Sequence, residues 1–467
     1  MNTRPAALIR GLGFWATAAM VVGNIIGTGI FTVPRAMARD TGAEGLIYLV
    51  WIVGGILSLF GALSIAELGA ALPEAGGSYV YLKRAFGPAW GFLFGWMNNV
   101  VGKPCSIASI ASGLLIFVAY IFPEAAAPLF TLFLQLPFAE NPYYFTFTLA
   151  QPLAAVAILF ITVVNYLGVR LAGQVQVALT SLKVGALLLI VACGFWFSGA
   201  VADPRSFSPA FFASTLVGGF LTALVAALWG YDGWIDITLA GSEVRDPQRS
   251  LPRAIIGGTL FVIVVYLLAN SVYFHLLTFD QVVAARNVAS NAVESFAGRD
   301  IAKWVTLAMV VSALGTLNSS ILTGARVPYA MARDGVFFRI ADGIHPRFYT
   351  PAGALLFQGV MASLMVLTGQ FEDLFSLFIF SQWIFYALAV ASLIRLRRLE
   401  PGLPRPYRTW GYPVVPVVFI LGALALTINL FIQRPGRSAA GLLLILSGLF
   451  FYRHWSRSSP PASVESA

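Results

Sequence analysis

The sequence predicts an all-α protein that crosses a lipid bilayer about twelve times. Of its 467 residues, 58% are hydrophobic and only 10% are charged, whereas charged residues make up about 25% of soluble domains. Nearly all of the chain lies in long apolar runs separated by short polar connectors, which is the pattern of a polytopic membrane protein. No connector is long enough for a second domain, so we expect a single membrane domain over residues 1–467.

Twelve apolar segments carry this prediction. Their approximate bounds are 12–36, 46–70, 86–120, 150–168, 174–198, 214–240, 254–278, 301–328, 350–369, 373–394, 411–432 and 438–453. A further apolar piece at residues 125–139 is too short to span a bilayer and contains two prolines, so we expect an interfacial or re-entrant segment there. The polar C-terminal tail, residues 454–467, is expected to be disordered.

The distribution of basic residues predicts the orientation of the chain. The formal charge is +9, but the Lys and Arg residues lie singly or in small groups between apolar segments, which argues against a nucleic-acid partner. If the N-terminus is cytoplasmic, the inner connectors and the termini hold most of these residues. The positive-inside rule then places both termini in the cytoplasm, in a multi-pass protein of the cell (inner) membrane.

The first apolar segment contains an interruption. Residues 23–34 read GNIIGTGIFTVP, in which Gly27 and Gly29 flank Thr28. Non-helical backbone at membrane depth is tolerated only where protein buries it or where it lines a water-filled cavity. The alternative is a glycine-lined face for helix packing.

The sixth segment contains a second interruption. There Gly230 and Gly233 flank Tyr231 and Asp232, and Asp236 follows. An aspartate at the centre of a bilayer costs about 2.5–3.5 kcal/mol, so its side chain is expected to face a cavity or a partner. An interrupted first helix in each half of a chain is typical of inverted-repeat transporters with a site at the membrane midplane. The predicted repeats are about 12–198 and 214–394, and two helices follow at about 411–453.

Two such interruptions favour a zwitterionic ligand. A helix start exposes unpaired N–H groups at its positive dipole end, and a helix end exposes unpaired C=O groups. The N–H groups near Gly29 can bind a carboxylate, and the carbonyl oxygens near Gly230 can bind an ammonium group. Because glycine lets a ligand approach the main chain, replacing Gly29 by valine is expected to impair binding more than folding.

Four stretches of the sequence resemble a known family. GNIIGTGIF, followed by Val33 and Pro34, resembles the first-helix signature of the amino acid–polyamine–organocation superfamily. WGYDGW with GSEVRDPQRSLPRA resembles the sixth helix and its loop in the L-type amino acid transporter branch, and LGTLNSSILTGARVPYAMARDG and RPYRTWGYPVVP are similar to its eighth helix and the start of its eleventh. The resemblance implies a twelve-helix, five-plus-five inverted repeat with discontinuous helices 1 and 6. It also implies amino acid transport by alternating access.

The resemblance further implies which residues bind the substrate. The first interruption would bind the substrate carboxylate, and the second would bind its amino group. Trp229 would act as an aromatic gate over the substrate; its alternative role is packing in the bilayer core. The implied substrate-binding residues are Ile26, Gly27, Thr28, Gly29, Trp229, Gly230, Tyr231, Asp232 and Gly233.

Lys183 is the most informative single charge. It lies about nine residues into the fifth segment, roughly 13 Å along a helix, which is deep for a lysine that snorkels to the interface. In the sodium-independent transporters that the chain resembles, a lysine of the fifth helix takes the place of a sodium ion and links the first interruption to the eighth helix. The implied partners here are Asn318 and Ser319, and sodium coupling is not expected. The alternative is a lysine satisfied by carbonyls or by a carboxylate, without a role in transport.

The resulting prediction is a sodium-independent transporter that exchanges or imports neutral L-amino acids. The alternative is proton-coupled transport of cationic amino acids or polyamines, which Asp232 and Asp236 favour, and a receptor that binds without transporting is a remote alternative. An enzyme is not expected, because the chain has no H-E-x-x-H or nucleophile-elbow motif. No cofactor or metal is expected. In mammalian members of the branch that the chain resembles, a cysteine between helices three and four binds a partner glycoprotein; residues 122–142 contain no cysteine here, so no disulfide-linked partner subunit is expected. The roles of Lys103 and Asp236, and the oligomeric state, stay open at this stage.

Overall fold

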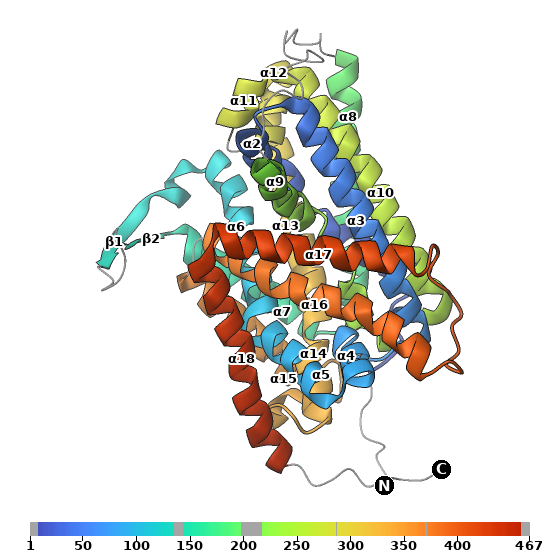
Figure 1. Ribbon diagram of the computed structural model, residues 1–467. Coiled ribbons are helices and arrows are strands. Elements are labelled where there is room, and N and C mark those ends of the chain that lie inside the picture. Colours follow the sequence, from blue (N-terminus) through green and yellow to red (C-terminus); the bar gives the residue numbers. More distant parts are fainter. Residues whose placement is uncertain (1–7, 135–142, 198–216, 286, 369–370, 459–467) are drawn as a thin grey trace.

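The computed structural model describes residues 8–134, 143–197, 217–285, 287–368 and 371–458, and most of them are helical (Figure 1). Each of the twelve predicted apolar segments contains at least one helix. Within the described residues, nine helical stretches are long and apolar enough to cross a membrane, and three apolar helices are shorter, Ala150–Tyr166, Gly219–Gly230 and Ala352–Thr368. The chain is therefore a polytopic membrane protein by length and composition of its helices.

The helices of the first half are α1 (Phe14–Ile25), α2 (Gly29–Thr41), α3 (Glu44–Ala71), α4 (Ser78–Phe86), α5 (Pro88–Met97), α6 (Lys103–Ile121), α7 (Ala150–Tyr166) and α8 (Val169–Phe197). Those of the second half are α9 (Val217–Gly230), α10 (Pro247–Leu276), α11 (Phe279–Ala284), α12 (Val288–Ala297), α13 (Arg299–Gly324), α14 (Arg326–Arg333), α15 (Ala352–Thr368) and α16 (Phe371–Leu399). Two more follow, α17 (Val414–Gln433) and α18 (Pro435–Ser458).

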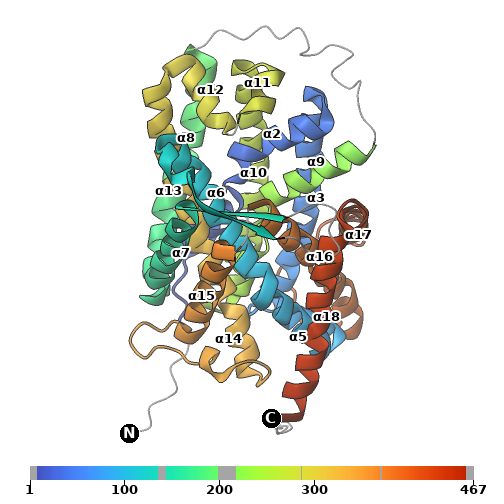
Figure 2. The same ribbon diagram turned by 90° about the vertical axis from the view of Figure 1, so that its left-hand side faces the viewer.

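Short helices mark two opposite ends of the molecule. The helices α11 and α12 lie at one end, and α4, α5 and α14 lie at the other (Figures 1 and 2). We call these the α12 end and the α14 end. Helix α9 ends partway between the two ends (Figure 2), and the first interruption lies beside that end, since a Cβ atom on Gly29 would lie 3.0 Å from the Cα atom of Gly230.

Part of the predicted interfacial or re-entrant segment at residues 125–139 forms a strand of a β-hairpin. Strands β1 (Pro128–Leu134) and β2 (Tyr143–Thr148) pair antiparallel, with Thr131 opposite Thr146. The rings of Phe130 and Phe147 stack 5.0 Å apart across the pair. Threonine and aromatic residues favour strands, and the hairpin projects from the helical body (Figure 1). The rest of the predicted piece, residues 135–139, lies outside the described residues.

The predicted disordered tail is shorter than expected. Helix α18 continues to Ser458 rather than ending near residue 453. Its last turns carry Trp455, whose ring lies 6.0 Å from both Phe92 and Phe451. This aromatic packing stabilises the helix beyond residue 453, where the predicted apolar segment ended. Residues 459–467 lie outside the described part of the chain.

Candidate functional site

The first interruption separates α1 from α2 by three residues. Helix α1 ends at Ile25, and α2 begins at Gly29. The N–H of Gly27 donates back to the carbonyl of Ile25 at 2.8 Å, a tight turn that takes this group out of the helical ladder. The N–H groups at the start of α2 have no carbonyl one turn earlier to bond within the helix. The N–H of Phe31 donates to the Thr28 carbonyl at 3.3 Å, and Gly29, the first residue of α2, lines the cavity described below.

The second interruption follows α9, which ends at Gly230. Turns occupy residues 231–235, and two short 3₁₀ turns follow at Asp236–Leu239 and Gly241–Glu243. Gly233 has a φ of +114°, and a Cβ atom there would lie 2.8 Å from Nδ2 of Asn24. Only glycine adopts this backbone and permits this approach without strain. The two interruptions are therefore in direct contact.

A tyrosine hydroxyl joins the two interruptions. The Tyr266 hydroxyl of α10 lies 2.8 Å from the carbonyl oxygen of Ile25 and 2.9 Å from that of Gly230. Both carbonyls lie at helix ends, where backbone acceptors lack intrahelical partners. The ring of Trp51 on α3 packs edge-on against the Tyr266 ring, with 5.1 Å between the ring centroids. Nothing in the sequence indicated that Tyr266 would bridge the two interruptions.

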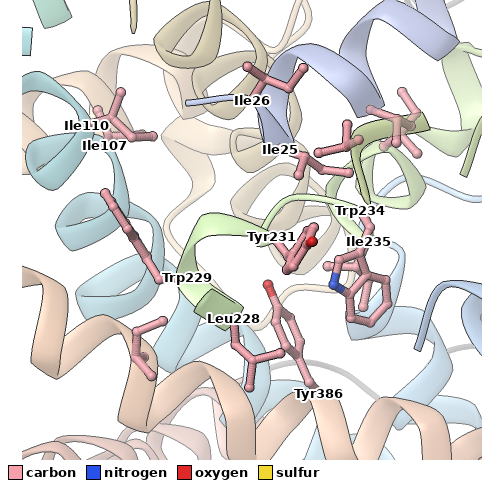
Figure 3. Close-up of a cluster of buried hydrophobic side chains, with 14 of the residues drawn as sticks. Ile25, Ile26, Ile107, Ile110, Leu228, Trp229, Tyr231, Trp234, Ile235 and Tyr386 are labelled. Carbon is pink, nitrogen blue, oxygen red and sulfur yellow. The ribbon is translucent and has the colours of Figure 1, made fainter. Parts of the chain in front are cut away.

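A small cavity lies between the interruptions. Its volume is about 30 Å³, which is room for roughly two water molecules. A second cavity of about 390 Å³ lies on the side of the α12 end, and Trp229 lines both. Figure 3 shows the Trp229 side chain pointing toward Ile107 and Ile110 of α6. The small cavity is lined by Asn24, Ile25, Gly27, Thr28, Gly29, Ser106, Ile110, Trp229, Gly230, Asp232, Asp236 and Thr316. A ligand larger than a few atoms therefore enters only if a wall such as Trp229 moves.

Two carboxylates line this cavity. Asp232 accepts a hydrogen bond from the Tyr386 hydroxyl at 2.7 Å. Asp236 pairs with Lys103, and the two side chains are each 5% exposed. The same Oδ2 atom of Asp236 also accepts a hydrogen bond from Asn24 at 2.6 Å. Among the described residues, no three His, Cys, Asp or Glu side chains come together as ligands for a metal.

Lys183 binds the first interruption. Its Nζ atom donates to the carbonyl oxygens of Gly23 at 2.8 Å and Ile26 at 2.7 Å. It also donates to the hydroxyl of Thr316 on α13 at 3.0 Å. The lysine is 2% exposed and lies outside the lining of the cavity. It thus links α1 to α13 through neutral oxygen atoms.

The partners predicted for Lys183 were wrong. Asn318 donates instead to the carbonyl of Ala172 and to Gln176 on α8, and Ser319 donates to the carbonyl of Met20 at 3.2 Å. Each residue along an α-helix turns by about 100°, so Thr316 and Asn318 point in different directions. The sequence placed the contact on the correct helix; Asn318 lies on another face of it, whereas Ser319 faces α1 one turn away from Thr316.

The structure brings most of the predicted binding residues to the cavity. Gly27, Thr28, Gly29, Trp229, Gly230 and Asp232 line it, whereas Ile26, Tyr231 and Gly233 do not. The Ile26 carbonyl is bound to Lys183, and the Tyr231 hydroxyl donates to the carbonyl of Trp51 at 3.1 Å. Other lining residues were missed because the sequence does not specify how their helices are rotated. They are Asn24, Ile25, Ser106, Ile110 and Thr316.

The α14 end holds further buried polar contacts. Glu243 accepts two hydrogen bonds from Arg326, at 2.6 and 3.0 Å, and both side chains are almost fully buried. The N–H of Leu12 donates to the Glu243 carbonyl at 3.0 Å, which ties the segment before α1 to the segment after α9. Nearby, the Tyr79 hydroxyl donates to Asp334 at 2.5 Å. Burial, and next the charge of Asp334, raise the pKa of Tyr79 far above its ordinary value, so this donor stays protonated.

A helical membrane protein with a polar cavity between two interrupted helices has the form of a multi-pass membrane transporter. The sequence profile of the amino acid permease family matches residues 12–451. The chain belongs to the amino acid permease family. Its activity at the level of this family is amino acid transport.

Three relatives show how far the similarity extends. The b(0,+)-type amino acid transporter 1 of Mus musculus is 33% identical over 454 residues, which are 96% of this chain and 88% of that protein. The serine/threonine exchanger SteT of Bacillus subtilis (strain 168) is 30% identical over 455 residues, 97% of this chain and 98% of that protein. The cystine/glutamate transporter of Homo sapiens is 28% identical over 456 residues, 96% of this chain and 84% of that protein. The family and these relatives are transporters and not enzymes.

Proposed function

We propose that this protein is a sodium-independent transporter that exchanges or imports neutral L-amino acids by alternating access. The observation that carries the proposal is the position of Lys183, whose ammonium group is bound by the carbonyls of Gly23 and Ile26 and by Thr316. A fixed cation at the first interruption satisfies the carbonyl oxygens that a bound metal cation would otherwise neutralise. The interruption therefore keeps its shape without sodium.

The contacts of the cavity support a zwitterionic substrate. The start of α2 at Gly29 offers N–H groups at a positive dipole end to a carboxylate. The end of α9 at Gly230 offers carbonyl oxygens at a negative dipole end to an ammonium group. Because both helix ends line one cavity, one amino acid can bridge them. Trp229 separates this cavity from the larger one toward the α12 end and would act as the gate.

The arrangement in the membrane is part of the proposal. In the part of the chain that the structure describes, nine long apolar helical stretches and three shorter apolar helices support the twelve proposed spans. The proposed repeats are residues 12–198 and 214–394, with α17 and α18 appended, in a single domain of the inner membrane with both termini cytoplasmic. The larger cavity then opens to the outside. Cys105 and Cys193 lie on helices α6 and α8, which supports a transporter without a disulfide-linked partner.

Transport in proteoliposomes tests this function. Purified protein should take up several radiolabelled neutral L-amino acids with saturation, and the rate should be equal in sodium and in choline buffer. If the protein is an exchanger, as its relative SteT is named, preloading the vesicles with unlabelled amino acid should accelerate uptake. Absence of saturable flux across a broad panel, with and without counter-substrate, would refute transport. Strict dependence on sodium would refute the role of Lys183, and saturable binding without flux would indicate a receptor.

A second candidate is proton-coupled transport of cationic amino acids or polyamines. The observation that favours it is the pair of carboxylates, Asp232 and Asp236, in the lining of one cavity. Carboxylates inside membrane proteins commonly carry protons or bind cations. Uptake of lysine or a polyamine that requires an inward proton gradient, and that is lost in Asp232→Asn, would favour this candidate over the first.

A further inference from the structure

The ion pair between Lys103 and Asp236 lies beside the cavity and is not one of the backbone groups proposed to hold the substrate. Both side chains are buried, and they come from helices that are distant in the sequence. A five-residue π-helical turn, Asn98–Gly102, directly precedes Lys103 at the start of α6. Such turns within helices often occur at functional sites.

Lys103 lies on the face of α6 that lines the cavity. Ser106 and Ile110 follow it by three and seven residues, and both of them line the cavity. Residues at this spacing share one face of a helix. Lys103 itself is not in the lining, whereas Asp236 is. The carboxylate of Asp236 therefore lies between the ammonium group and the space that a substrate side chain would occupy.

Among the described residues, the lining of the cavity holds two carboxyl side chains and no basic side chain. Asp236 is neutralised by Lys103 and receives a second donor from Asn24. Asp232, which also lines the cavity, has the neutral hydroxyl of Tyr386 as a hydrogen-bond donor. A negatively charged substrate side chain would meet these carboxylates in a poorly solvated space, where like charges repel strongly.

We propose that Asp236 determines substrate specificity by neutralising Lys103, so that the cavity rejects amino acids with acidic side chains. This inference rests on the proposed amino acid transport. Without the charge of Asp236, the Lys103 ammonium would be the nearest counter-charge for a ligand, and an acidic side chain would take the place of the resident carboxylate. Without the charge of Lys103, two carboxylates would remain and would favour a cationic side chain.

Counterflow in proteoliposomes tests the inference with three variants. The probes are L-glutamate, L-lysine and the neutral L-amino acid that the wild type exchanges fastest. Asp236→Asn keeps an oxygen that can accept the Asn24 hydrogen bond, and it should raise the ratio of glutamate to neutral exchange by about ten-fold or more. Lys103→Gln should raise the ratio of lysine to neutral exchange by a similar factor. The double variant, whose pair is uncharged, should return both ratios to within a few-fold of the wild type.

Glu67→Gln is the matched control. Glu67 is also a fully buried carboxylate paired with a cation, Arg397, but it does not line the cavity. Its substitution should leave both ratios unchanged, even if it lowers the yield of protein.

Three results would overturn the inference. The first is a wild type that exchanges glutamate as fast as neutral amino acids. The second is an Asp236→Asn protein that folds and exchanges neutral amino acids with an unchanged glutamate ratio. The third applies if Asp236→Asn does not fold: it is a Lys103→Gln protein whose ratio of lysine to neutral exchange equals that of the wild type. A wild type that carries no amino acid refutes the proposed function and the inference together. An active wild type whose variants keep the wild-type exchange ratios refutes the inference alone.

Discussion

The contact between the two interruptions makes Gly29→Ala the most informative single substitution. Gly29 begins α2, and its Cα faces the end of α9 across the cavity. A Cβ atom at this position would lie 3.0 Å from the Cα atom of Gly230 and 3.3 Å from the ring of Trp229. The Gly230 atom belongs to the main chain and cannot rotate away. One methyl group therefore has to push the two halves of the clamp apart.

The size of the effect follows from these distances. Carbon atoms in contact lie about 3.5–4.0 Å apart, so the two segments must separate by roughly 0.5 Å or more. Overpacking of this kind costs about 1–3 kcal/mol. If the cost falls on the bound state, in which both helix ends hold one ligand, affinity drops by about 5- to 150-fold. The contact also shows that valine at position 29 would disturb folding as well as binding, so alanine is the sharper test.

Gly27→Ala is the matched control for Gly29→Ala. Gly27 lines the same cavity, but the nearest atom to a Cβ atom there would be Cγ2 of Thr316, at 3.4 Å, which is ordinary contact. We expect its affinity for a neutral amino acid to stay within a few-fold of the wild type, measured by equilibrium binding to detergent-solubilised protein. Thermal stability of each variant would be measured in the same detergent. Equal affinities for the two variants, with both folded, would refute the contact between the interruptions as part of the binding site.

Three further substitutions test other contacts of the site. Lys183→Met should abolish transport, because two backbone carbonyls lose a charged donor that contributes about 1.5–3 kcal/mol per hydrogen bond; flux at the wild-type rate would contradict the role proposed for this lysine. Gly233→Ala should lower the unfolding temperature and the affinity together, since its φ of +114° and its approach to Asn24 exclude a side chain, and an unchanged unfolding temperature would contradict that reasoning. Arg326→Met should destabilise the protein by about 3–5 kcal/mol because Glu243 would be left buried without its partner, whereas Arg326→Met with Glu243→Gln should recover part of the loss in a thermal-stability assay.

The interruptions could be predicted from the sequence because lipid penalises free backbone groups. Glycines at 27, 29 and 230 within apolar segments have few physical explanations at membrane depth. In the structure Gly27 lies in the gap between α1 and α2, Gly29 begins α2 and Gly230 ends α9. The depth of Lys183 was likewise visible, since its distance from the helix end excluded simple snorkelling. In these cases one-dimensional spacing and the cost of burial were sufficient.

The partners of these residues could not be predicted, because they depend on how each helix is rotated. Thr316 and Asn318 are both plausible polar residues of one helix, and only packing against α1 and α8 selects Thr316 for Lys183. The pairing of Lys103 with Asp236 joins α6 to a short 3₁₀ turn. The sequence showed both charges, but no pattern in it relates their positions.

The contacts separate two tasks that one site must perform. Lys183 and Tyr266 bind backbone carbonyls at the interruptions, so they set the shape of a clamp that meets the main-chain groups common to all amino acids. Asp232 and Asp236 present their carboxyl groups at the same cavity, and their side-chain partners described above are Tyr386, Lys103 and Asn24. Substitutions at the first pair should therefore decide whether any amino acid is carried, and substitutions at the second should decide which one. This division predicts that specificity can change between related chains at position 236 while the clamp stays intact.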